Sequence, residues 1–355
     1  MKIVLILCLN VLLALSIAAP VPPASAQQLD WAKVLEAGKK EGVVVAASSS
    51  LGGKAGVTVA NAFKEKYGIP LELFTGRMAV AQEKIDVEQK SKSYVTDAMD
   101  SGGINVLLLK KKGYLTRVTG DLPVLKERDK FPHPVTEDVE QEMVNILEIY
   151  TFLAINTDLV KSGEEPKSWH DLLDPKWKGK IFLTHPMYTT APEEQLLAFT
   201  KGKILNEDYF AKLFRNASVG GTGGGNEAMD KIVRGEFAIG GFFPGTTALK
   251  PLGAGAPIKL LDLREGRLSK PMKWGAIKNL PHPNATRVFI NWFLSKDGQV
   301  LITKETGLES VRNDVPSSIP VRFHGPTIRL SFQDMELAEE RRAKNYMANL
   351  FGLKR

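Results

Sequence analysis

Cysteine is almost absent from this sequence: the single cysteine, Cys8, lies in an apolar run near the start of the chain. The remainder therefore excludes disulfide bonds, thiolate metal sites and a cysteine nucleophile. Tracts rich in Lys and Arg with interleaved aromatic residues are also missing, so we expect no nucleic-acid partner. The five histidines form no HxxxH or HExxH pair, and we expect neither a bound metal nor another cofactor.

The setting of a serine nucleophile is lacking as well. No GxSxG motif occurs, and Ser48, Ser49 and Ser50 lie in a polar turn without the sharp elbow that exposes a catalytic serine. Catalysis would need an activated nucleophile or a metal. We therefore expect a protein that binds without catalysing. The alternative from another class is a secreted enzyme acting on a small anionic substrate.

One long hydrophobic run is present, from residue 3 to residue 19, and it contains Asn10 and Ser16. Lys2 precedes this run, and small residues end the segment at Ala26. A positive start, an apolar stretch and a small-residue cleavage site predict a signal peptide, residues 1–26, cleaved after Ala26. The alternative is a membrane anchor, for which the run is short. We expect the mature chain to be exported to the periplasm.

The formal net charge of the chain is modestly positive, +7 at pH 7. This charge favours acidic ligands weakly and does not specify a fold. The basic residues between positions 250 and 278 are interpreted as a solvated face.

Apolar segments of strand length and of helix length alternate along the rest of the chain. Such alternation is typical of parallel sheets covered by helices on both faces. Because 355 residues are long for one core, we expect an α/β protein of two doubly wound lobes. Strands are predicted at 43–47, 69–74, 94–99, 146–156, 181–184 and 237–240. Helices are predicted at 30–42, up to about Tyr67, and at 78–90, 106–115, 208–214, 227–235, 284–294, 295–307 and 331–350, with loops at 185–190 and 241–247. The predicted N-caps are Asp30, Ser168 (before a short helix, with Asp171 three residues on), Asn284 and Ser295, and glycines such as Gly42 and Gly307 are predicted to end helices.

A glycine-rich segment, GGTGGGN, covers residues 220–226 just before a predicted helix. It is not a P-loop, because Asn226 and Glu227 stand where that motif has a lysine and a hydroxyl. It is not a dinucleotide fingerprint, because no acidic residue ends the following strand. Glycine backbones and a helix N-terminus together bind anions. The segment therefore predicts an anion cradle, and the alternative is a plain surface turn.

Four other residues are candidates for contact with a ligand. Arg77 follows a predicted strand and can pair with a carboxylate or phosphate in fork geometry, or it is a surface arginine. His185 and Tyr188 share a loop and can hold a metal or a ligand, or they are solvated. Phe243 can pack on a ligand or fill the core.

Several stretches together resemble the extracellular solute-binding proteins of ABC importers, family 1, in the branch that includes the ferric-binding proteins. The resemblance covers essentially all of the chain after the predicted signal peptide. It is carried by residues 165–181 (EPKSWHDLLDPKWKGKI), 153–160 (LAINTDLV), 255–257 (GAP) with 265–266 (EG), 282–286 (HPNAT), 295–299 (SKDGQ) and 310–315 (SVRNDV).

The resemblance implies a type II periplasmic binding protein, whose two lobes close about a hinge on a ligand in the interlobe cleft and deliver it to a membrane permease. Lobe 1 would comprise residues 29–130 and 265–318. Lobe 2 would comprise residues 131–264 and 319–355. A carrier of this kind is expected to be a monomer, because closure needs a free cleft.

The positions of the family's iron ligands carry other residues here. The histidine position falls near Leu51, the glutamate position near Gly102, and the tyrosine pair near Gly245 and Thr246. No tyrosine occurs between residues 213 and 325. Ferric ion needs anionic oxygen ligands, which glycine and threonine do not supply.

The residues that stand there instead are hydrogen-bond donors, so we predict a small organic anion, a carboxylate or a phosphonate. The predicted ligand-binding residues are Ser48, Ser49, Arg77, Gly102, Gly103, His185, Tyr188, Thr189, Gly224, Gly225, Asn226, Phe243 and Thr246. The alternatives are a ferric or metal–anion binder that uses His185 and Tyr188, and a periplasmic sensor subunit. The sequence does not name the ligand or the permease.

Overall fold

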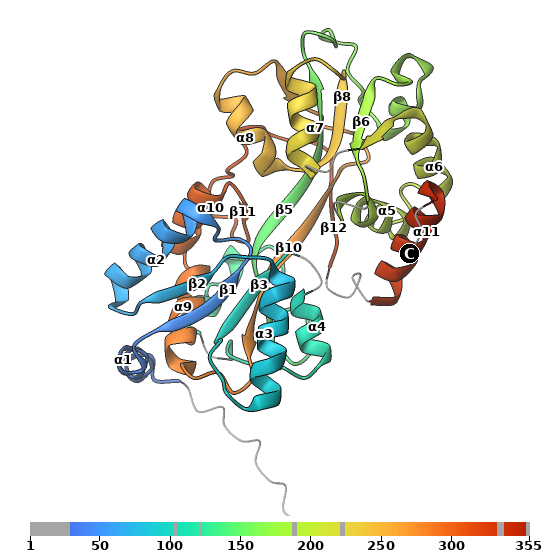
Figure 1. Cartoon of the computed structure of the whole chain (residues 1–355). Helices are drawn as coiled ribbons and strands as arrows, with labels where there is room; N and C mark the ends of the chain where they lie inside the picture. The colour runs from blue at the N-terminus through green and yellow to red at the C-terminus, as the bar shows by residue number, and fades with distance from the viewer. Residues whose placement is uncertain are drawn as a thin grey trace, which may run out of the picture.

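The structure is a computed structural model, and it describes residues 29–102, 105–120, 122–186, 190–220, 224–331 and 337–352. Figure 1 shows an α/β molecule of two lobes joined by long strands. Lobe 1 holds the first helices and strands of the chain and lies below in the view. Lobe 2 lies above and carries the last helix. The predicted α/β class with two lobes is confirmed.

Lobe 1 is built from an α/β run near the start of the chain and two helices that return to it much later. The early elements are α1 (Trp31–Glu41), β1 (Val44–Ser48), α2 (Gly53–Tyr67), β2 (Leu71–Phe74), α3 (Met78–Ser91), β3 (Ala98–Ser101), α4 (Asn105–Lys111) and β4 (Leu115–Thr116). The returning elements are α9 (Pro283–Leu294), α10 (Lys296–Thr306) and β11 (Glu309–Ser310). Short 3₁₀ turns, η1 (Pro123–Lys126) and η2 (Arg128–Lys130), lead out of the lobe.

Lobe 2 repeats the α/β pattern in the middle of the chain. Its elements are η3 (Trp169–Leu173), η4 (Pro175–Trp177), β6 (Ile181–Thr184), α5 (Ala191–Lys201), α6 (Glu207–Asn216), β7 (Ser218–Gly220), α7 (Gly224–Val233), β8 (Ile239–Pro244), α8 (Gly245–Gly253) and β9 (Ile258–Leu260). The last helix, α11 (Leu337–Phe351), packs on α5.

One mixed sheet runs through both lobes, with strand order β2-β1-β3-β10-β5-β8-β6-β7. Within each lobe the outer strands are parallel, as predicted. The antiparallel pair β5 (Met143–Asn156) and β10 (Arg267–Ile277) connects the lobes, and β12 (Thr327–Arg329) pairs with β10. Strands this long cross the whole hinge, so the two predicted parallel sheets are fused into one.

Strand β5 contributes to the cores of both lobes. Val144 and Ile146 pack in lobe 1 with Trp274 and Phe289, whose rings meet edge to face at 5.4 Å. Further along the same strand, Phe152 packs in lobe 2. Burial of these large apolar side chains fixes both ends of the strand, and only its middle lies between the lobes.

Several predicted boundaries follow from local signals and are confirmed. Asp30 and Ser295 cap α1 and α10 with their side chains, and Ser168 forms a capping box with Asp171. Gly307 ends α10 in the left-handed conformation, with φ +71°.

Other predicted boundaries are wrong. The expected loop at 241–247 is instead the end of β8 and the first turn of α8. The expected helix at 106–115 ends at Lys111, and Leu115 begins β4 because it packs in the sheet. The strand expected at 94–99 is shifted to β3. Asn284 does not cap α9; His282 holds the N-cap position, and the Asn284 side chain donates to Glu41 instead.

Candidate binding site in the interlobe cleft

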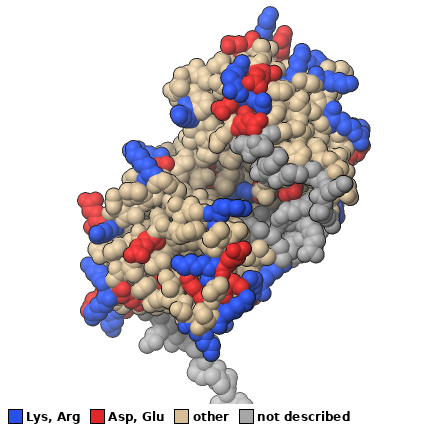
Figure 2. All heavy atoms as spheres, viewed as in Figure 1, with Lys and Arg blue, Asp and Glu red and all other residues tan. Residues whose placement is uncertain are grey.

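The carboxyl ends of the parallel strands in both lobes face the space between the lobes. In lobe 1 these are the ends of β1, β2 and β3, and in lobe 2 the ends of β6, β7 and β8. Figure 2 shows that the surface is hollowed between the two lobes. Ligands of open α/β sheets bind at this edge, where strands turn into helices. The predicted interlobe cleft is therefore the candidate site.

Three helices that begin at this edge have no capping side chain at their N-cap residue. They are α2, α3 and α8, whose N-cap residues are Gly52, Arg77 and Pro244. Away from the cleft, Asp30, Asn206 and Ser295 cap α1, α6 and α10. Helix N-termini carry unpaired N–H groups and a positive dipole end, which favour an anion.

The serine turn after β1 is held by a carboxylate that the sequence analysis did not single out. Asp100 of β3 is completely buried. Its Oδ1 accepts from the backbone N–H groups of Ser49 and Ser50, at 3.0 and 3.1 Å, and from the Ser49 hydroxyl at 2.9 Å. Its Oδ2 accepts from the hydroxyls of Ser48 and Ser50. Burial raises the pKa of Asp100, and this effect outweighs the hydrogen bonds from the serines, which lower the pKa.

The serines therefore have different roles. Ser48 is buried and bonded to Asp100, so it supports the turn and does not face the cleft. Ser49 is exposed and remains a candidate for ligand contact. The sequence did contain a signal for Asp100. An aspartate in a short buried strand needs hydrogen-bond donors, and the serine-rich turn that follows β1 supplies them.

The second half of the glycine-rich segment is the first turn of α7, while residues 221–223 lie outside the described part. Gly224 begins the helix with φ +59°, in the region that favours glycine. A Cβ on Gly225 would lie 2.8 Å from Cβ of Phe243. Glycine at this position thus lets α7 pack directly on β8, and Asn226 is exposed beside it.

Phe243 is in the core. It is fully buried on β8 with Phe152 and Ala248, so it supports the site from behind. Thr246 lies in the first turn of α8, half-buried, beside Gly307 of lobe 1. Thr246 therefore lies where the two lobes contact each other.

Three further predicted residues are described. Arg77 is exposed at the start of α3. Gly102 directly follows β3, and a Cβ there would meet Ile149 at 2.9 Å. The ring of His185 is 5.1 Å from that of Phe351, and burial lowers the pKa of this histidine. Gly103, Tyr188 and Thr189 lie outside the described residues.

Two lysines of β10 overturn the expectation that residues 250–278 present only a solvated basic face. Lys270 and Lys273 are both buried, at 8% and 4% exposure. Lys270 Nζ donates to Oε1 of Glu194 in the first turn of α5, at 2.5 Å. Neither Lys270 nor Glu194 was predicted for the site. The sequence signal was the position of Lys270 and Lys273 in a stretch whose other residues are apolar apart from one serine, residues 268–277 (LSKPMKWGAI).

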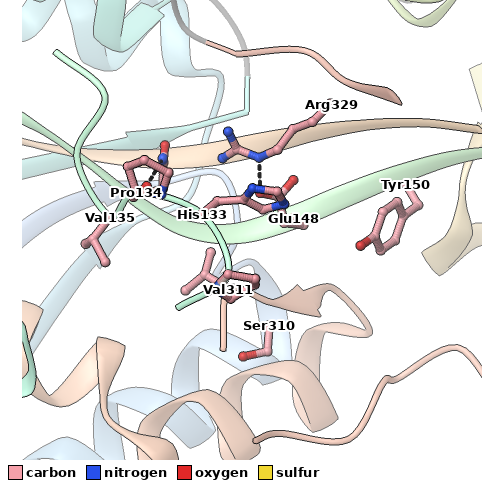
Figure 3. Close-up of a pocket in the computed structure, with 10 residues that line it drawn as sticks. His133, Pro134, Val135, Glu148, Tyr150, Ser310, Val311 and Arg329 are labelled. Atoms are coloured by element: carbon pink, nitrogen blue, oxygen red, sulfur yellow. Dashed lines mark hydrogen bonds and ion pairs between the residues drawn. The ribbon is translucent and has the colours of Figure 1, made fainter. Parts of the chain in front are cut away.

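A small polar cavity lies at the hinge, where β5, β11 and β12 meet. Its volume is about 60 Å³, which holds a few waters. Figure 3 shows Arg329 beside Glu148, with Tyr150 and Ser310 on the cavity wall. Arg329 Nε donates to Glu148 Oε1 at 2.8 Å, and its guanidinium also pairs with Glu137. This ionic cluster joins β12 to β5 and to the segment that precedes β5.

Among the described residues, no group of three or more His, Cys, Asp or Glu side chains could hold a metal ion. No described helix is long and apolar enough to cross a membrane.

Comparison with known proteins identifies the family. The model for the bacterial extracellular solute-binding proteins matches residues 58–322. The chain belongs to this family of extracellular solute-binding proteins. The family consists of transport binding proteins rather than enzymes. The resemblance found in the sequence motifs is thereby confirmed.

A curated relative and several solved structures are similar to this chain. An uncharacterised protein of Haemophilus influenzae (strain ATCC 51907 / DSM 11121 / KW20 / Rd) is 30% identical over 198 residues, 53% of this chain and 57% of that protein. The match thus spans little more than half of that relative.

The similar structures show the fold at low identity. Iron-bound HitA from Pseudomonas aeruginosa has 20% identity and a TM-score of 0.71, over 87% of this chain and 99% of that one. A putative extracellular solute-binding protein from Bordetella parapertussis has 18% identity and a TM-score of 0.72, over 87% and 98%. AfuA from Actinobacillus pleuropneumoniae, with fructose-6-phosphate bound, has 19% identity and a TM-score of 0.63, over 88% and 99%.

Proposed function

We propose that the protein binds a small organic anion of the carboxylate or phosphonate type in the interlobe cleft and delivers it to its membrane permease. The observation that carries the proposal is the set of uncapped helix N-termini at the cleft edge, those of α2, α3 and α8. Their unpaired N–H groups need an acceptor when the cleft closes and excludes water. An anionic group satisfies several of them at once and interacts favourably with the helix dipoles.

Two cationic side chains also favour a negatively charged ligand. Lys270 lies between the lobes, and Arg77 lies at the start of α3. In this proposal the exposed Ser49 and Asn226 and the half-buried Gly224 and Thr246 contact the solute. Asp100 and Phe243 hold the contacting loops in place from behind.

The lobe boundaries belong to the same proposal, with residues 29–130 and 265–318 forming lobe 1 and residues 131–264 and 319–355 forming lobe 2. The packing of α9 on α1, of α10 on α2 and of α11 on α5 supports this division. We further propose that residues 1–26 are a signal peptide and that the carrier works as a monomer.

Native mass spectrometry of the protein purified from the periplasm tests the proposed ligand. We expect an adduct with the mass of a small organic acid, which disappears on denaturation, and a mature chain that begins after Ala26. The same acid, added back to stripped protein, should raise the thermal midpoint, because a ligand that binds only the folded state stabilises it. An iron adduct that survives buffer exchange would overturn the proposal in favour of a ferric carrier.

A further inference from the structure

The ion pair between Lys270 and Glu194 joins the hinge strand β10 to the first turn of α5 in lobe 2. In the sheet, Lys270 pairs with Ile149 of β5. A Cβ on Gly102, at the carboxyl end of β3, would meet Ile149 and Met272 at 2.9 and 3.5 Å. Glu194 lies in the first turn of α5, the helix that follows β6. The pair therefore connects the hinge strand to lobe 2 at the edge where solute binds.

Both partners are nearly buried but have unused hydrogen-bonding capacity. Their side chains are 10% and 13% exposed. The ammonium of Lys270 has three donor hydrogens, and Glu194 Oε1 is the one acceptor found for it among the described residues. Oε1 of Glu194 also accepts from the Thr190 hydroxyl at 2.8 Å, whereas Oε2 accepts from none of the described residues.

A solute that carried only negative charge would compete with Glu194 for Lys270. If the solute drew Lys270 away from Glu194, the largely buried carboxylate of Glu194 would lose its ionic partner, which is strongly unfavourable. Keeping the pair intact would place the anion of the solute beside the Glu194 carboxylate, where like charges repel at low dielectric. A solute that also carries an ammonium group avoids both penalties, because it supplies Glu194 with a new donor.

We propose that the solute is a small zwitterion, whose anionic group binds Lys270 and whose ammonium group binds Glu194. The two groups must lie only a few bonds apart, since the two side chains are within hydrogen-bonding distance of each other. This inference rests on the proposed function and names the class of organic anion that the cleft takes.

The test is isothermal titration of ligand-stripped protein with matched pairs of probes. The pairs are 3-aminopropionate with propionate, and 2-aminoethylphosphonate with ethylphosphonate. We expect at least one aminated probe to bind about tenfold or more tightly than its partner, the effect of one charge-assisted hydrogen bond. Glu194→Gln should abolish this preference, and Lys270→Gln should weaken the binding of both members of the pair.

The control variant is Glu207→Gln, which changes a carboxylate in the first turn of α6, away from the cleft, and should leave the preference intact. Because either site variant could fold poorly, the double variant Lys270→Gln/Glu194→Gln keeps a neutral hydrogen-bonded pair and should also lack the preference. The ligand extracted from the native protein gives a second readout: it should react with fluorescamine, a reagent for primary amines.

The outcomes separate the two proposals. Equal binding of aminated and plain probes, or an extracted organic acid without an amine, overturns the zwitterion and leaves the anion carrier standing. A preference that survives Glu194→Gln also overturns it. If none of the four probes binds and the native adduct is iron, both proposals fail.

Discussion

At the scale of single residues, Lys273 shows how burial on the hinge strand changes ionisation. It is 4% exposed, and its Nζ has no hydrogen-bond partner among the described residues. Burial lowers the pKa of Lys273 from the ordinary value of 10.5 to about 8. The negative charges of Glu137 and Glu148 raise this pKa, and the positive charges of Arg329 and Lys270 lower it further. At neutral pH the folded protein thus holds a buried ammonium at a cost.

Replacing this lysine should therefore stabilise the protein. Between pH 8 and 10.5 the unfolded chain binds the proton and the folded one does not, so the stability of the wild type rises with pH across this window. Below pH 8 the full penalty is present. One pKa unit corresponds to about 1.4 kcal/mol, so Lys273→Met should raise the unfolding free energy at pH 7 by up to roughly 3 kcal/mol.

Urea denaturation at pH 7, 9 and 10.5 measures this effect. The advantage of Lys273→Met should shrink steadily over that range and vanish at the top of it. The exposed Lys64, on α2, provides the matched control, since Lys64→Met should change stability little at any of these pH values. A destabilising Lys273→Met at pH 7 would mean that the ammonium has a bound partner.

At the scale of secondary-structure elements, the contact between α7 and β8 depends on Gly225. A Cβ there would lie 2.8 Å from Cβ of Phe243 and 3.2 Å from Cδ of Pro244. Gly225→Val should therefore push the N-terminus of α7 away from β8 and destabilise the protein by about 1–3 kcal/mol, as overpacking does. It should also weaken solute binding, because the displaced turn faces the cleft.

The comparison is with Asn226→Val, one position further along the same helix turn. Asn226 is exposed, so the larger side chain meets no core there and stability should change little. Differential scanning calorimetry compares the stability of the two variants, and titration with the native solute measures the binding of Gly225→Val. Equal stability of the two variants would show that α7 shifts without strain.

At the scale of the whole molecule, the connections between the lobes predict closure. Strands β5 and β10 run from one lobe core to the other. A third connection follows β11, since Val311 packs in the core of lobe 1 and Ile319 in that of lobe 2. Few segments cross the hinge, and they bend together when the cleft closes.

Small-angle X-ray scattering of solute-loaded and stripped protein tests this motion. We expect the radius of gyration to fall on loading, because the lobes approach and the cleft loses water. The measurement should be repeated with Lys270→Gln, whose weakened binding should need more solute for the same change. An unchanged radius at saturation would argue for a cleft that is preformed.

Much of this protein follows from local signals in the sequence. Caps such as Asp30 and Ser295, helix-ending glycines such as Gly307, and apolar runs of two lengths were sufficient to predict most helices and the strands β1, β2, β3, β5, β6 and β8, but not the hinge strand β10 or helix α5. These signals act within a few residues, so they can be read in order along the chain. The family motifs extended them to two lobes and a carrier function.

Tertiary structure alone decided which side chains meet around the candidate site. No local signal places the Asp100 carboxylate on the hydroxyl of Ser48, or Phe243 in the core behind Gly225. Lys270 and Glu194 are 76 residues apart and meet only because β10 and α5 converge at the hinge. Partners so distant are brought together by packing, and burial then sets their charge and their hydrogen bonds.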